Sequence, residues 1–303
     1  MGTPDTLDVT LDATARRLAR EAVRALYAEL VLEPKPGLVS LCDTGSHADM
    51  DAGHFMRSLF SLRHYFAQMV RAGAEGAPFA ELEQLGQQAE ARMLAATGGV
   101  NTHRGAIFCL GLLCASAGWC IAAGLPLRAE SLRDSLRAGW GDSLRARADK
   151  TSRQPPRSNG QRAARAHGLR SAGDEAADAF PVLFEVSLPV LLRAQAAGWP
   201  DRRARVQALF ATMAVLDDTN LVHRGGIQGL HDARRAAQAF LDEGGAEGAD
   251  WRERARAIHS DFVARRLSPG GAADLLGAAC WLERVTQADD TARPVAMTHA
   301  ALA

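Results

Sequence analysis

An uncharged run over residues 105–124 constrains the fold of this chain more than any other feature. A helix without charges on any side must be buried all round, either in a membrane or at the centre of a globular protein. The run is rich in Gly, Ala, Ser and Cys rather than in Leu and Ile, and it stands alone in the chain. We therefore predict a buried central helix and no membrane span.

The start of this run carries the sequence Asn-Thr-His-Arg at residues 101–104, preceded by Gly98 and Gly99. Glycine permits a tight turn or the close approach of a ligand to the backbone. Asn101 or Thr102 can cap the helix, and the free amides of its first turn then attract an anion. The segment predicts a helix start that faces a phosphate group.

The composition excludes several classes of partner. The chain has 303 residues, with 35 basic and 35 acidic side chains, so bulk binding to nucleic acid or to a membrane surface is not expected. Its five cysteines form no CxxC pair and are interpreted as reduced thiols. The first residues lack an apolar signal region, and we expect a cytoplasmic protein.

Apolar residues recur with helical spacing along most of the chain, and no stretch alternates convincingly with a period of two. We predict an all-α fold in which residues 1–303 form a single domain, a bundle of roughly ten helices. Residues 145–170 are polar and basic and contain Pro155, Pro156 and Gly160. We interpret this segment as a mobile basic loop that runs into a helix.

Four polar clusters lie at breaks between the predicted helices: Glu29 with Lys35, residues 45–51, residues 101–104 and residues 217–226. Lys35 stands out because the only other lysine is Lys150. Long loops that are dense in glycine and charge are usually functional in compact domains. We therefore expect these clusters to contribute to a site.

Carboxylates in two of the clusters suit a hard cation such as Mg²⁺, which keeps waters and substrate phosphates in its shell. They are Asp49, Asp51, Asp217 and Asp218. The alternative for each is an ordinary helix cap. Spacing typical of zinc ligands, such as HExxH, is absent, so the histidines are interpreted as hydrogen-bonding groups.

Arg104 and Arg224 each follow a histidine and are suited to binding phosphate with two parallel hydrogen bonds. The alternative for both is a buried pair with an aspartate. Neither a Walker motif nor a GxSxG motif is present. Residue types and spacing alone thus indicate a helical enzyme with a metal and phosphate pocket, and go no further.

The chain also resembles the triphosphoribosyl-dephospho-CoA synthase family, whose members supply the prosthetic-group precursor of malonate decarboxylase and citrate lyase. The resemblance rests on five motifs in the expected order: PKPGLV (34–39), GSHADMD (45–51), GGVNTHRGAIF (98–108), DDTNLVHRGG (217–226) and SPGGAADLL (268–276). Residues 158–170 are more similar to the malonate decarboxylase branch. Ser171 and Ala179 stand where the family usually has glycine, which bears on the local loop geometry.

The resemblance implies a pentosyltransferase. The 2′-hydroxyl of 3′-dephospho-CoA would attack C1 of the ribose of ATP, adenine would leave, and the triphosphate would stay on the product. Such a displacement passes through an oxocarbenium-like state and needs a general base, an anchor for the triphosphate and help for the leaving adenine. Mg²⁺ is the implied cofactor, and a phosphoribosyl-dephospho-CoA transferase is the implied downstream partner.

Residue types then suggest roles within this reaction. The candidate catalytic carboxylates are Asp49, Asp51, Asp218 and Glu29. The candidate metal ligands are Asp217, Asp218 and Asp49. The candidate groups for binding phosphate and ribose are Lys35, His47, Asn101, His103, Arg104, Asn220 and Arg224.

Two other functions compete with this interpretation. A helical Mg²⁺-dependent hydrolase of nucleotide or ADP-ribose-like glycosidic bonds would use the same aspartate-rich turns. A non-catalytic helical protein that binds the prosthetic-group precursor and delivers it to an acyl carrier subunit would need the same binding groups but no chemistry.

Overall fold

The computed structural model describes residues 4–156 and 158–292, and this part of the chain is helical without any β-strand. The helices are α1 (Pro4–Leu30), α2 (Ala52–Leu62), α3 (Tyr65–Ala74), α4 (Phe79–Ala96), α5 (Arg104–Ala122), α6 (Ala129–Arg153), α7 (Asn159–His167), α8 (Ala172–Ala177), η1 (Leu183–Ser187), α9 (Leu188–Ala196), α10 (Asp201–Val215), α11 (Thr219–Asp242), η2 (Gly245–Glu247), α12 (Trp251–Ala264) and α13 (Gly270–Ala292). The all-α prediction is confirmed.

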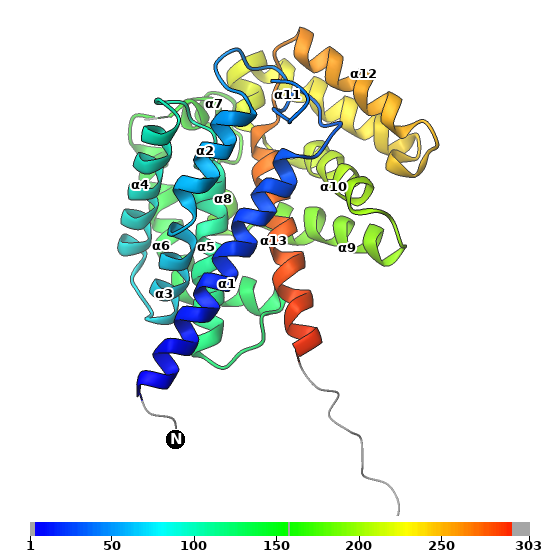
Figure 1. Ribbon diagram of the computed structural model, residues 1–303. Helices are drawn as coiled ribbons and strands as arrows, with labels where there is room; N and C mark the ends of the chain where they lie inside the picture. Colours follow the sequence, from blue (N-terminus) through cyan, green and yellow to red (C-terminus); the bar gives the residue numbers. More distant parts are fainter. Residues whose placement is uncertain (1–3, 157, 293–303) are drawn as a thin grey trace, which may run out of the picture.

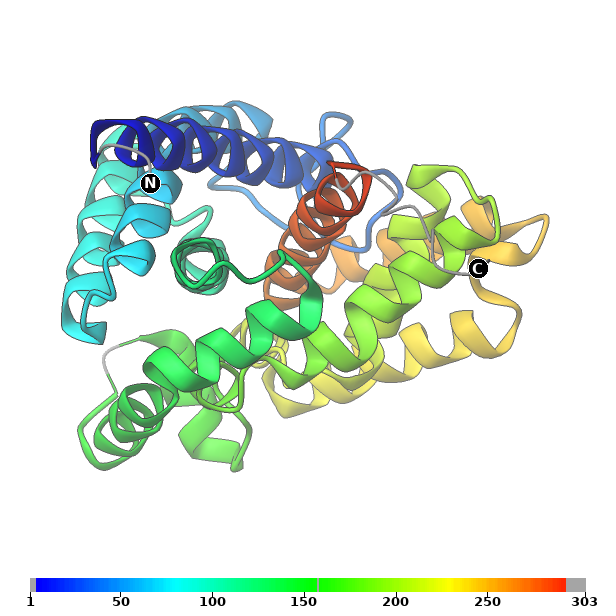
Figure 2. The same ribbon diagram turned by 90° about the horizontal axis from the view of Figure 1, so that it is seen from below.

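Helix α5 lies at the centre, as predicted from its lack of charge. Figure 2 shows it nearly end on, with other helices around it. Its length and hydropathy would suffice to cross a membrane, but 72% of its apolar window is buried inside the fold. The helices packed around α5 include α1, α3, α4, α6 and α13, so α5 is a core helix.

Small residues let α3 and α5 approach closely. A Cβ atom on Gly73 would collide with the backbone of Ala115, and one on Gly118 would collide with the backbone of Val70. The Gly and Ala content of the central run therefore has a packing reason: the two helices meet backbone to backbone, and a larger side chain has no space there.

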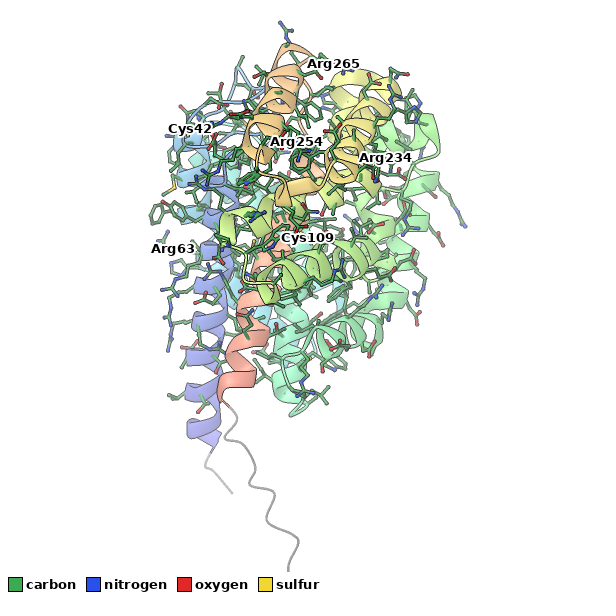
Figure 3. The ribbon with its side chains drawn as sticks, turned by 90° about the vertical axis from the view of Figure 1, so that its right-hand side faces the viewer. Cys42, Arg63, Cys109, Arg234, Arg254 and Arg265 are labelled. Carbon is green, nitrogen blue, oxygen red and sulfur yellow. The ribbon has the colours of Figure 1, made fainter. Side chains whose placement is uncertain are left out.

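The remaining helices complete the bundle on either side of α13. Helix α13 runs beside α1 (Figure 1), and Trp281 Nε1 donates to the Leu18 carbonyl at 3.1 Å. On the far side, the rings of Phe210 and Phe240 stack at 3.9 Å between α10 and α11. Arg254 of α12 donates to the Gly245 carbonyl at 2.8 Å and holds α12 against the end of α11 (Figure 3).

Residues 145–170, expected to be a loop that runs into a helix, are mostly helical. Helix α6 continues to Arg153, because Leu132, Leu136, Trp140 and Leu144 keep one apolar face buried and no proline interrupts the helix before Pro155. Helix α7 then begins at Asn159 with a serine cap. The surface of this segment is basic and polar, but its periodicity remains helical.

The close contact between α3 and α5 predicts an unusual sensitivity to one methyl group. Gly118→Ala should lower the free energy of unfolding by about 1–3 kcal/mol through overpacking, measured by urea denaturation. Gly86→Ala on α4 is the matched control, because its Cβ would meet only the Tyr65 hydroxyl at 3.6 Å. That control should be neutral or stabilising by up to about 1 kcal/mol. Equal stabilities for the two variants would contradict the packing account.

Candidate active site

The polar clusters predicted from the sequence gather at one end of the bundle. The end of α1, the loop that follows it, and the starts of α5, α11 and α13 all lie at the upper end in Figure 1. Their polar side chains form several groups of contacts, some buried and some at the surface.

Glu29 and Lys35 form an ion pair in the interior. Lys35 Nζ donates to Glu29 Oε1 at 2.6 Å and to the Glu29 carbonyl at 2.8 Å, and the side chains of Lys35 and Glu29 are 1% and 6% exposed, respectively. Helix α1 ends at Leu30, ahead of Pro34, and the Lys35 ammonium group lies against the last turn of that helix. Burial lowers the pKa of Lys35, and the nearby Glu29 opposes this shift. Lys35 therefore faces an internal partner rather than an open surface.

The loop over residues 45–51 is tied to α11 and to the turn before α13. Arg224 donates to the Ser46 carbonyl at 3.0 Å and to His47 Nδ1 at 2.7 Å. Because Nδ1 accepts, His47 Nε2 carries the proton and donates to the Ser268 hydroxyl at 2.9 Å. Burial and the charge of Arg224 lower the pKa of His47 to about 4, so the ring is neutral at physiological pH.

The two aspartates of this loop have different positions. Asp51 caps α2 in a reciprocal capping box with His54, which is the alternative role considered for it, and hydrogen bonds from His54 lower its pKa. Asp49 lies 3.6 Å from His47 Nδ1, and its side chain is 63% exposed. Asp49 is thus the freer carboxylate of the pair.

The segment before α5 contains two polar atoms without a partner. His103 is buried, and its Nδ1 lies 2.7 Å from the Ser58 hydroxyl, but its Nε2 has no hydrogen-bond partner among the described residues. The Thr102 hydroxyl is also buried without a partner in that part of the chain. Burial, helped by the charge of Lys35, lowers the pKa of His103 to about 3, so this ring is neutral too.

The ends of the same segment make local contacts. The N-cap of α5 is His103, which makes no side-chain capping bond, so neither Asn101 nor Thr102 takes the predicted cap position; Asn101 Oδ1 still accepts from the Arg104 amide at 3.2 Å. Arg104 Nε donates to Glu90 Oε1 at 2.6 Å on the surface, so its guanidinium has a partner within the fold. Gly98 and Gly99 have positive φ values of 66° and 91°, the conformation for which glycine is needed.

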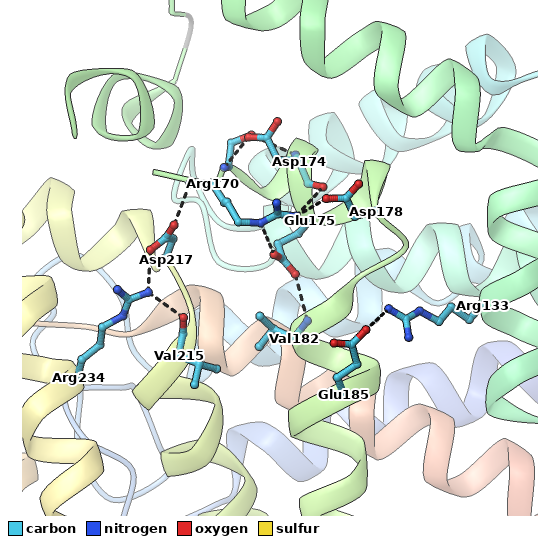
Figure 4. A network of polar contacts seen from close by, with 11 residues as sticks. Arg133, Arg170, Asp174, Glu175, Asp178, Val182, Glu185, Val215, Asp217 and Arg234 are labelled. Carbon is cyan, nitrogen blue, oxygen red and sulfur yellow. Dashed lines mark hydrogen bonds and ion pairs between the residues drawn. The ribbon is translucent and has the colours of Figure 1, made fainter. Parts of the chain in front are cut away.

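Asp217 and Asp218 bind other parts of the fold. Asp217 accepts from Arg234 at 2.7 Å and from the Arg170 amide at 2.9 Å (Figure 4). Asp218 is buried and accepts from the Asn220 amide at 2.9 Å and from the Ala272 amide at 3.0 Å, so it caps α11 and the start of α13 together. Burial raises the pKa of Asp218. Asn220 itself remains exposed.

A carboxylate that residue types did not single out completes the group. Asp274 of α13 lies against the start of α5, where it accepts from the Ala106 amide and where a Cβ on Gly105 would collide with it. It is surrounded by protein yet retains partial exposure. Burial, with Glu29 and Asp218 nearby, raises its pKa well above the ordinary value. One sequence signal could have identified it: Asp274 is the only charged residue in 270–282.

The expected Mg²⁺ does not fit a site made by these residues alone. Within residues 4–156 and 158–292, no group of three or more His, Cys, Asp or Glu side chains is placed to hold a metal ion. Asp217 and Asp218 are already bound by an arginine and by backbone amides.

A hollow of about 310 Å³ lies between α6, α8 and the residues before α8. Arg145 and Arg170 line it together with Asp149, Asp174 and Asp178. Arg170 bonds to Glu175 at 3.0 Å and to Asp178 at 2.6 Å, and its amide reaches Asp217 (Figure 4). The predicted basic segment 145–170 thus borders the candidate site through Asp217.

The buried ion pair predicts a strong effect on stability. Lys35→Met should lower the free energy of unfolding by about 3–5 kcal/mol, because it leaves the Glu29 carboxylate buried and unpaired. The double variant Glu29→Gln with Lys35→Met should recover part of that loss in urea denaturation. Lys150→Met, at an exposed lysine of α6, is the control and should change little. A Lys35→Met protein as stable as this control would contradict the account.

Comparison with known proteins shows the family to which the chain belongs. The family model described as ATP:dephospho-CoA triphosphoribosyl transferase matches residues 15–292. Relatives curated as "Probable 2-(5''-triphosphoribosyl)-3'-dephosphocoenzyme-A synthase" include one from Acinetobacter calcoaceticus, 38% identical over 93% of this chain and 95% of its own length. Another, from Stutzerimonas stutzeri, is 40% identical over 91% of this chain and 94% of its own. No solved structure matches the chain. The chain therefore belongs to the ATP:dephospho-CoA triphosphoribosyl transferase family, and it is a transferase.

Proposed function

We propose that this transferase joins the triphosphoribosyl group of ATP to the 2′-hydroxyl of 3′-dephospho-CoA and releases adenine. Its relatives are named as the corresponding synthase, and the similarity to this chain extends over nearly their whole length. The reaction is a displacement at a sugar carbon rather than a phosphoryl transfer. It needs a general base at the attacking hydroxyl, a grip on the triphosphate that orients the ribose, and a desolvated cleft for the oxocarbenium-like state.

The observation that carries this proposal is the meeting of distant motifs at the helix starts. Residues 45–51 reach Ser268 and Arg224, residues 217–220 reach Ala272, and Gly105 reaches Asp274. The four segments are far apart in the sequence, and each brings a polar group to the same end of the bundle. Such convergence of polar groups with perturbed pKa values is typical of a catalytic site.

The proposed site combines open and buried parts. Asn101, Asn220 and Asp49 remain exposed around it and are placed to meet a substrate from solvent. Glu29 and Lys35 lie beneath, and we assign them to support of the site rather than to contact with phosphate. We also propose that Mg²⁺ enters bound to the triphosphate of ATP, since the described carboxylates hold no preformed metal site.

The biological context is a further part of the proposal. The similarity of residues 158–170 to the malonate decarboxylase branch supports a product that serves that enzyme, with citrate lyase as the alternative. A cytoplasmic location and a downstream phosphoribosyl-dephospho-CoA transferase follow from the same proposal.

The direct test is incubation with ATP, dephospho-CoA and Mg²⁺, followed by mass spectrometry. We expect free adenine and a triphosphoribosylated dephospho-CoA in equal amounts, neither of which forms when dephospho-CoA is omitted. Adenine released from ATP alone would instead support a glycosidic hydrolase. Binding of dephospho-CoA without any adenine would support a non-catalytic carrier of the precursor.

Arg224 provides a second prediction, because one guanidinium holds two successive residues of the loop 45–51. Lysine cannot reproduce this two-pronged contact. Arg224→Lys should lower kcat/KM at least about 10-fold, which corresponds to about 1.4 kcal/mol of transition-state stabilisation. Arg235→Lys, an exposed arginine on the same helix, is the control. Equal kcat/KM values for the two variants would show that the loop does not depend on Arg224.

A further inference from the structure

Asp274 is a carboxylate in a place where a carboxylate is costly. The residues around it in α13 are apolar or glycine, and it is packed against the first turn of α5. No ion pair to Asp274 occurs within residues 4–156 and 158–292, and the contact that stabilises its charged form is the backbone amide of Ala106. A deeply placed carboxylate with one backbone donor and no cation lowers stability relative to a neutral side chain of the same shape.

The charged and titratable groups that face Asp274 make its ionised form still less favourable. Glu29 comes from α1 and Asp218 from the residue before α11, and both carry negative charge. Cys109 of α5 is a buried thiol whose pKa is raised, with Asp274 among the causes. Lys35, the partner of Glu29, pairs with that carboxylate and not with Asp274. The surroundings therefore favour a carboxyl group that readily holds a proton.

A second observation points to a ligand at the same place. His103 Nε2 and the Thr102 hydroxyl are buried and lack hydrogen-bond partners among the described residues. Thr102 and His103 lie three and two residues before Gly105, the residue in contact with Asp274. The His103 ring is also close enough to Lys35 for that charge to act on it. Lys35, whose charge acts on His103, pairs with Glu29, and Glu29 acts on Asp274, so the unpaired His103 nitrogen belongs to the same polar region as this carboxylate. Buried polar atoms are nearly always satisfied in proteins, so these two atoms mark a position for a polar group of a ligand.

Asp274 also has the access that a catalytic group requires. Unlike Glu29 and Asp218, which are 5% and 2% exposed, Asp274 is partly exposed, and its carboxylate lies directly against Gly105, where a Cβ atom would collide with it. Glycine at position 105 therefore makes room for this carboxylate at the start of α5.

Resting on the proposed function, we propose that Asp274 is the general base for the acceptor hydroxyl of dephospho-CoA. Its carboxylate accepts the proton of the 2′-hydroxyl while that oxygen bonds to C1 of the ribose of ATP. The C1–N9 bond breaks with its electron pair going to adenine. The proton then passes from Asp274 through solvent to adenine, which leaves the carboxylate ready for another turnover. Thr102 and His103 hydrogen-bond the acceptor ribose.

The test compares Asp274→Asn with Asp134→Asn, an exposed aspartate of α6 whose side chain is 73% exposed. Asp274→Asn should reduce adduct formation at least about 100-fold, the usual contribution of a general base. Its binding of dephospho-CoA, measured by calorimetry, should stay within threefold of wild type. Its melting temperature should equal or exceed that of wild type, because a neutral amide removes a poorly solvated charge. If Asp274 had only a structural role, Asp274→Asn would instead lower the melting temperature.

The dependence on pH provides a readout that does not need the asparagine variant. In wild type, kcat/KM should fall as the pH is lowered, and this acid limb of the pH profile should reflect a single protonation, because protonated Asp274 cannot act as a base. Asp274→Glu should keep measurable turnover with that limb displaced. An acid limb that is identical in Asp274→Glu and wild type would overturn the proposal, as would Asp274→Asn turnover within tenfold of wild type.

The two levels of proposal fail separately. If wild type itself forms no adduct with ATP and dephospho-CoA, the proposed function is wrong. If wild type forms the adduct and Asp274→Asn forms it equally well, the function stands and only the role of Asp274 is wrong.

Discussion

The structure depends on side-chain carboxylates that accept hydrogen bonds from the free backbone amides at the starts of helices. They take the place of water or of a bound anion. The first amides of a helix have no partner within it, and where the helix start is buried they cannot turn to water. Asp218 serves α11 and α13 together, and Asp274 serves α5. These contacts hold three helix starts in one place, and the loops that carry His47 and Lys35 pack onto them. The sequence pattern at residues 101–104 predicted that the start of α5 binds an anion. In the structure, the Asp274 carboxylate of the protein itself lies at that helix start.

This arrangement has a cost in stability and a use in catalysis. Carboxylates removed from water ionise less readily, which is how a protein moves the pKa of an acid toward the range in which it exchanges protons with a substrate. Glu29 avoids the penalty by pairing with Lys35, and Asp218 offsets part of it with several backbone donors. Asp274 has the weakest compensation of the three and the greatest access to solvent. The same features that make it unfavourable for folding make it suitable for proton transfer.

Sequence reasoning was accurate where one local rule decided the outcome. The central helix followed from the absence of charge, and the cap at Asp51 followed from the position of an acidic residue before an apolar run. It was less accurate at residues 145–170, where a basic surface concealed the buried face of α6. It also passed over Asp274, because a single aspartate in an apolar helix was not weighed against the neighbours that only folding brings to it.

The sequence by itself determined the helical class, the central position of residues 105–124 and, through its ordered motifs, the family. These depend on composition, periodicity and short segments, all of which are local. Only the tertiary structure decided which polar residues share an environment: that Lys35 is neutralised by Glu29, that Arg224 holds the loop at Ser46, and that Asp274 meets the start of α5. The physical reason is that desolvation and charge coupling depend on distances between groups that lie far apart along the chain.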